Sequence, residues 1–84
     1  MATPNRIEAL QRFCEQWKES LNALTARRDH LLSLQNTGVY IFENDGPNLL
    51  PTLISEADAA VLQVQNILIK MESLRDRALA GEDV

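Results

Sequence analysis

The side chains that could do chemistry are few and far apart along the chain. Cys14 is the single cysteine and His30 the single histidine. The two residues are sixteen positions apart on one predicted helix, too far to bind one metal ion together. A single cysteine allows no disulfide within the chain. Cys14 and Trp17 are one helical turn apart in an apolar pattern, so we predict that both are core residues.

The carboxylates do not organise into a catalytic site. Glu15 and Glu19 share one helix face, but Lys18 lies beside them, and Glu56 and Asp58 point in different directions. The sequence contains no Gly-rich phosphate loop, nucleophile elbow or metal-ligand cluster. We therefore predict a non-enzymatic protein with no catalytic residue, cofactor, metal or small-molecule substrate.

Charge narrows the classes of partner. Eight Lys and Arg stand against twelve Asp and Glu, a formal charge of −4. Proteins that bind nucleic acid or anionic membranes need a basic face, so we expect neither partner. The segment Arg27-Arg28-Asp29-His30 is either a solvated helix face or a phosphate or nucleic-acid contact. With no apolar run of the ~20 residues that cross a bilayer and no signal-peptide pattern, a cytoplasmic location is the default expectation.

Two apolar patterns with alternating three- and four-residue steps occupy most of the chain. This is the heptad a/d spacing, which places one apolar residue per turn on one side of a helix. The first pattern comprises Ile7, Leu10, Cys14, Trp17, Leu21, Leu24, Arg28 and Leu31, and the second Leu50, Leu53, Ala57, Ala60, Val64, Ile67, Met71, Leu74 and Ala78.

Local signals mark the helix ends. Thr3-Pro4 supplies an N-cap hydroxyl and a first-turn proline, and Gly38 suits the left-handed position that follows a helix. The second helix begins either near Leu50, with Pro51 in its first turn, or at Ser55 with a capping box. The apolar spacing favours the earlier start.

We predict an all-α fold, an antiparallel, coiled-coil-like hairpin of two helices that dimerisation completes to a four-helix bundle. Residues 1–84 form one domain, with helices at about 4–35 and 50–80, a connector at 36–49 and a frayed tail at 81–84. A chain of 84 residues without disulfide or metal has a small core of its own, which favours association.

Arg28 interrupts the first apolar pattern. It either extends its charged end into solvent or specifies the register by pairing with Glu56 across the hairpin. The residues expected in the seam between the helices are Leu10, Cys14, Trp17, Leu21, Leu24, Leu31, Val64, Ile67, Met71 and Leu74.

The second helix carries more apolar residues than one neighbouring helix can cover. A band of this kind on a small protein marks an association surface, and each side chain buried there contributes about 1.5–3 kcal/mol. We therefore predict a homodimer, a complex with another protein chain, or both. The residues assigned to self-association are Ile54, Val61, Leu62, Leu68 and Ile69.

The connector is long, since two to eight residues usually join two helices. Its Val39-Tyr40-Ile41-Phe42 segment, 39–42, is β-branched and aromatic, which is typical of an extended strand. Tyr40 and Phe42 either cover the open end of the hairpin or belong to an exposed segment that binds a partner protein. Both hold if Tyr40 and Phe42 face inward while Val39 and Ile41 face outward.

Two hypotheses for function follow. The first is a non-enzymatic interaction or assembly module that self-associates through an apolar helix face and binds a protein partner through residues 39–42. The second is a small acidic inhibitor or regulator that docks on the basic surface of a nucleic-acid-handling complex. Ionic strength separates them, because only the second loses affinity steeply as salt rises.

Overall fold

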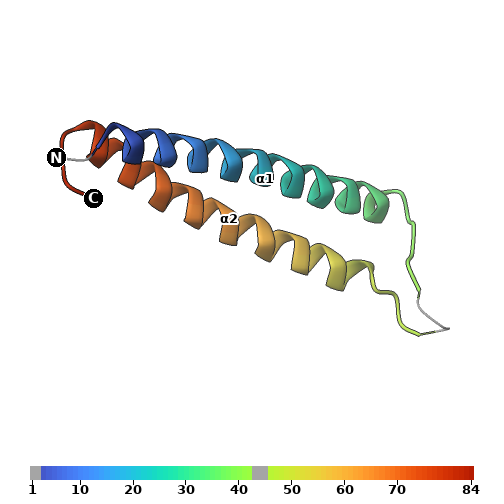
Figure 1. Ribbon diagram of the computed structural model, residues 1–84. Coiled ribbons are helices and arrows are strands. Elements are labelled where there is room, and N and C mark those ends of the chain that lie inside the picture. Colours follow the sequence, from blue (N-terminus) through green and yellow to red (C-terminus); the bar gives the residue numbers. More distant parts are fainter. Residues whose placement is uncertain (1–2, 43–45) are drawn as a thin grey trace.

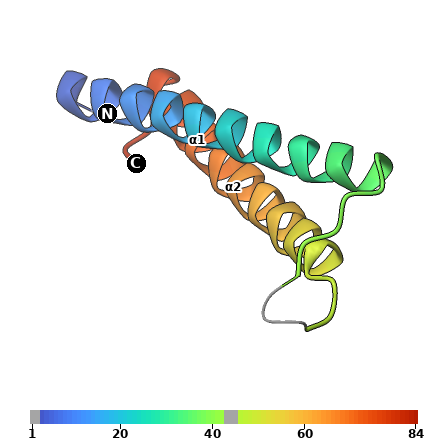
Figure 2. The ribbon, with the colours of Figure 1, turned by 90° about the vertical axis from the view of Figure 1, so that its right-hand side faces the viewer.

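The structure is an antiparallel hairpin of two long helices. The computed structural model describes residues 3–42 and 46–84, with α1 at Pro4–Asn36 and α2 at Leu50–Leu79. Figure 1 shows both termini at one end and the connector at the other, and Figure 2 shows that the helix axes are inclined to each other. The molecule measures 59 Å by 18 Å by 16 Å. The predicted all-α hairpin is confirmed.

The ends of α1 follow the predicted local signals. The Thr3 side chain accepts a hydrogen bond from the Arg6 N–H at 3.2 Å, and Pro4 occupies the first turn. At the other end Gly38 has φ +77°, and the Val39 N–H donates to the Leu34 carbonyl at 3.0 Å. This is the Schellman arrangement, which needs the left-handed backbone that glycine adopts without strain.

The chain after α2 turns back instead of fraying. Gly81 has φ +95°, and the Glu82 N–H donates to the Arg77 carbonyl at 3.0 Å. Val84 then packs against the buried pair Leu10 and Ala78. Residues 81–84, predicted as a frayed tail, thus lie beyond α2, and Val84 can reach the core because Gly81 reverses the chain.

Apolar residues of α2 form three lengthwise rows, each with a seven-residue repeat, here called rows a, d and e. Heptad repeats keep the members of one row on one side of a helix. Rows a and e supply the buried residues of α2, whereas the whole of row d is only partly buried. Row a is Leu50, Ala57, Val64, Met71 and Ala78; row d is Leu53, Ala60, Ile67 and Leu74; row e is Ile54, Val61, Leu68 and Arg75.

The apolar pattern predicted row d in the seam with α1 and row e beside it. In the structure row e is in the seam and row d lies beside it. Val61 and Leu68, predicted on a surplus face beside the seam, are only 1% and 7% exposed. Ile67, predicted in the seam, is partly exposed. Both row pairs have three- and four-residue steps, so the spacing alone does not distinguish them. In the folded chain α1 lies over rows a and e.

Two clusters hold the ends of the hairpin. Near the termini, Leu10 and Ala78 are buried with Met71 and Leu74 packed around them, as predicted. Near the connector the core consists of one leucine from α1 and the first turns of α2. Its buried members are Leu31, Leu50 and Ala57, and Leu34, Ile41, Leu53 and Ile54 pack against them.

The exchange of rows is testable with two adjacent substitutions. Val61→Asp places a carboxylate in the core, and we expect the unfolding free energy to fall by at least about 3 kcal/mol. Leu62→Asp, at a position 56% exposed, should lower it by less than about 1 kcal/mol. Chemical denaturation followed by circular dichroism, at one protein concentration, measures both. Equal effects would contradict the burial of row e.

Candidate functional site

One side of the hairpin is apolar along its length, and we call it the apolar flank. It combines row d of α2 with the side of α1 that carries Phe13, Trp17 and Leu24. Leu24 and Arg27 line one shallow depression with Leu53 and Ala60, which places the two helix sides on one surface. The apolar members are Phe13, Trp17, Leu24, Leu53, Ala60, Ile67 and Leu74.

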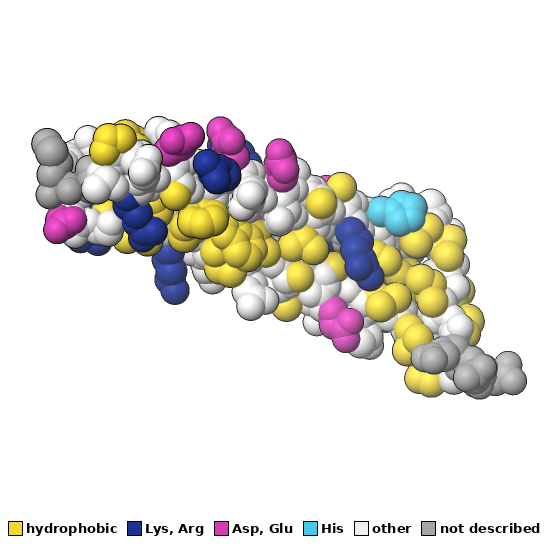
Figure 3. All heavy atoms as spheres, in the orientation of Figure 1, with side chains coloured by type: hydrophobic (Ala, Val, Ile, Leu, Met, Phe, Trp, Pro, Cys, Tyr) yellow, Lys and Arg dark blue, Asp and Glu magenta, His cyan; other side chains and the backbone are white. Residues whose placement is uncertain are grey.

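The apolar flank is incompletely covered within the hairpin. Phe13 is 40% exposed, and the remaining members of the flank are partly buried. Figure 3 shows hydrophobic side chains along the junction of the two helices on the viewed face, interrupted by Lys or Arg side chains that lie across the band. A largely apolar band of this kind on a small chain is typical of an association surface.

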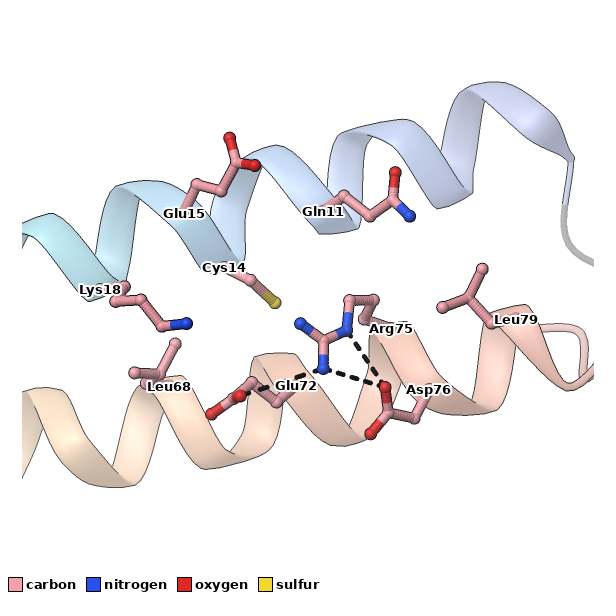
Figure 4. A pocket seen from close by; sticks show the side chains of 9 residues that line it. All are labelled: Gln11, Cys14, Glu15, Lys18, Leu68, Glu72, Arg75, Asp76 and Leu79. Atoms are coloured by element: carbon pink, nitrogen blue, oxygen red, sulfur yellow. Dashed lines mark hydrogen bonds and ion pairs between the residues drawn. The ribbon is translucent and has the colours of Figure 1, made fainter.

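The opposite side of the hairpin is polar, and we call it the polar flank. Its residues line a groove of about 570 Å³ between the helices, with Cys14 and Leu68 at its base. In Figure 4 the Arg75 side chain lies across this groove and the Cys14 thiol points toward it. The polar lining residues are Gln11, Glu15, Lys18, Glu72, Arg75 and Asp76.

Arg75 replaces an apolar residue in row e and is held by carboxylates of its own helix. It pairs with Asp76 at 3.0 Å and with Glu72 at 3.9 Å. The hydrogen bond with Asp76 is the main cause that raises the pKa of Arg75, against a smaller opposing effect of desolvation. The guanidinium is therefore a fixed positive charge beside the buried thiol.

Arg28 forms the ion pair between the helices. Its Nη1 lies 3.4 Å from Asp58 Oδ1 of α2, and its Nη2 lies 3.3 Å from Asp29. The predicted partner Glu56 is wrong. Asp58 is the nearer carboxylate because it lies on the polar flank, whereas Glu56 lines the depression on the apolar flank. With 28% of the Arg28 side chain exposed, the pair is a surface contact of modest energy.

The connector turns one apolar side chain inward and three outward. Ile41 packs against the core cluster at the connector end, whereas Val39, Tyr40 and Phe42 are 41%, 65% and 59% exposed. Of the two alternatives for Tyr40 and Phe42, the one in which they cover the hairpin end is therefore wrong, and the strict alternation with Val39 and Ile41 outward is not found. The two rings lie 6.1 Å apart at an angle of 30°, forming an exposed aromatic pair.

Asn48 holds the connector so that Ile41 faces inward. Its side-chain oxygen accepts hydrogen bonds from the Ile41 and Leu50 N–H groups, both at 3.1 Å. The Leu49 N–H also donates to the Ile41 carbonyl at 2.7 Å. Asn48 thus joins Ile41, which lies between the two aromatic residues, to the first turn of α2. The signal for this link in the sequence is the place of Asn48 two residues before Leu50.

The residues assigned to self-association are not gathered on one surface. Val61 and Leu68 are buried, Ile54 packs in the connector-end cluster, and Leu62 and Ile69 are 56% and 63% exposed on the outer side of α2. Of the ten predicted seam residues, four are buried and six are partly exposed. The buried four are Leu10, Cys14, Leu31 and Val64, and the other six are Trp17, Leu21, Leu24, Ile67, Met71 and Leu74.

The described residues offer neither a metal site nor a membrane span. Across 3–42 and 46–84, no group of three or more His, Cys, Asp and Glu side chains could hold a metal ion. Within the same ranges neither helix is long and apolar enough to cross a bilayer.

The connector can be tested by comparing inward and outward residues. Ile41→Ser removes a packed side chain, so we expect about 1 kcal/mol of destabilisation, a fall of about 4–8 °C in the Tm. The matched double variant Tyr40→Ser with Phe42→Ser should change the Tm by less than about 3 °C, since both rings are exposed. Thermal denaturation measures both, and a larger loss in the double variant would restore the covering role of the rings.

Comparisons with known proteins return no match. No family model matches the chain, and no curated protein or solved structure is similar to it.

Proposed function

We propose that this chain is a non-enzymatic interaction module that self-associates through its apolar flank. The observation that carries the proposal is the row of half-exposed Leu, Ala and Ile side chains on α2, next to Phe13 and Trp17 of α1. A second copy is the occupant that fits best, because an identical apolar flank covers the whole length of this one and closes a four-helix bundle.

The energetics favour association. Full burial of a Leu, Ile or Phe side chain contributes about 1.5–3 kcal/mol, and completing the burial of one that the hairpin already covers in part contributes a smaller share of that. Each copy brings several such side chains, so a dimer gains enough to offset the entropy of association. The proposed surface differs from the one assigned from sequence, because rows a and e are already used within the hairpin.

The exposed aromatic pair is the candidate contact for a further protein. Two uncharged rings on a segment held by Asn48 suit an apolar pocket on a partner. They lie on the connector, apart from the apolar flank, so the chain would bind its partner without opening the dimer.

The acidic-inhibitor alternative has less support. Six carboxylates lie in ion pairs with arginines: Glu8, Asp29, Asp58, Glu72, Asp76 and Glu82. An acidic mimic would instead present carboxylates free of such partners to a basic surface. A steep fall in partner affinity between low and physiological salt would favour this alternative over the aromatic contact.

The oligomeric state tests the main proposal. We expect the wild-type chain to have twice its monomer mass in light scattering at low micromolar concentration. Ile67→Asp places a charge within the apolar flank and should weaken the dimer at least about 100-fold, while the half-exposed position keeps the monomer folded.

Two further variants serve as controls. Ala60→Glu makes the same test at a smaller, half-exposed residue of the flank, and Leu62→Asp changes an exposed leucine outside it. Circular dichroism verifies that each variant is helical. A wild-type monomer, or equal weakening by Leu62→Asp and Ile67→Asp, would overturn self-association through this flank.

A further inference from the structure

We infer that the two copies pack with their connectors at opposite ends, about a two-fold axis that crosses α2 next to Gln63. The inference rests on the proposed dimer and specifies its geometry. Two closed arrangements bring the apolar flanks face to face. In one, α2 lies antiparallel to α2 of the second copy; in the other, α2 lies on α1 of the second copy and the connectors share one end.

Row d of α2 fits its own antiparallel copy. In an antiparallel pair of identical helices, the numbers of any two facing residues add up to the same total. If Ala60 faces Ile67 of the second copy, Leu53 therefore faces Leu74. All four members of the row are then covered. Each Ala60 lies opposite a large Ile67, the alternation of small and large side chains that interdigitated packing requires.

Charges beside row d agree with the same axis. Glu56, Gln63 and Lys70 follow one another at seven-residue spacing and are all exposed. The axis that pairs Ala60 with Ile67 brings Glu56 to within one residue of the level of Lys70 of the second copy, twice, and brings the two Gln63 equally close. Within the described part of the chain, neither Glu56 nor Lys70 makes an ion pair.

The same axis also brings apolar residues of the two α1 helices together. Leu10 packs with Ala78 and Arg28 pairs with Asp58, so residues of α1 and α2 lie at one level when their numbers sum to between 86 and 88. The axis next to Gln63 therefore crosses α1 near Leu24. It places Phe13 opposite Leu34 of the second copy, two apolar side chains at the edge of the flank.

The shared-end arrangement is less favourable electrostatically. It pairs α1 with α2 of the second copy at the levels found within the hairpin. At these levels Glu56 and Lys70 face α1 of the second copy and not each other, so that the two attractive Glu56–Lys70 pairs are lost.

A charge-reversal experiment distinguishes the two. Glu56→Lys and Lys70→Glu should each weaken the homodimer by about tenfold, because each replaces two attractive pairs with two repulsive ones. Their mixture should form the heterodimer in excess over the statistical half, since all facing pairs are then attractive. The double variant in one chain should recover wild-type dimerisation. Native mass spectrometry of differently tagged chains measures these populations.

A control variant and two possible outcomes show whether the dimer geometry fails alone or together with self-association. Glu15→Lys reverses an exposed charge on the polar flank and should leave dimerisation unchanged. A wild-type dimer whose two reversed variants mix only statistically would overturn the opposite-end geometry and leave self-association standing. A wild-type monomer would overturn both.

A cross-linking measurement gives a second, independent readout. In a Cys14→Ala background, Gln63→Cys should form a covalent dimer with a short bis-maleimide, because the axis brings both copies of residue 63 together. The shared-end arrangement instead predicts cross-linking between separate chains carrying Leu24→Cys and Gln63→Cys, because residues 24 and 63 lie at one level. That pattern, with no product from Gln63→Cys alone, would contradict the inference.

Discussion

A helix that packs against a single neighbour can bury only a narrow part of its circumference. α2 carries three apolar rows, which is more than its contact with α1 can cover. α1 covers rows a and e, which leaves Leu53, Ala60, Ile67 and Leu74 at the edge of the contact. The rest of the surface follows from this choice. Phe13 and Trp17 lie on the same flank as row d, and the polar groove that holds Arg75 lies on the other side.

The helices and their ends were predictable because their signals are local. Thr3 with Pro4 and the glycine at 38 act through hydrogen bonds within a few residues, so no tertiary information is needed to interpret them. The choice between rows d and e is different. Ile67 and Leu68 are adjacent and both apolar, and only the position of α1 around α2 determines which one is buried.

The connector illustrates the same limit at the level of one side chain. The composition of residues 39–42 predicted an extended segment, but not that Ile41 is the residue that faces inward. That orientation depends on Asn48, whose side-chain oxygen holds the Ile41 backbone against the start of α2. A contact between residues seven positions apart, across a turn, has no periodic signature in the sequence. The inward Ile41 leaves the aromatic pair outside.

The hairpin topology also means that contacts at its two ends form at different stages of folding. Contacts between Leu31 and Leu50 close a short loop, whereas Leu10 and Ala78 join residues near opposite chain ends. Loop-closure entropy opposes the longer closure by about 0.6 kcal/mol for each doubling of length. Helix pairing is therefore favoured to begin at the connector and to reach the termini last. In the native state the terminal turns should exchange their amide protons first, and the packing of Val84 against the terminal cluster slows that opening.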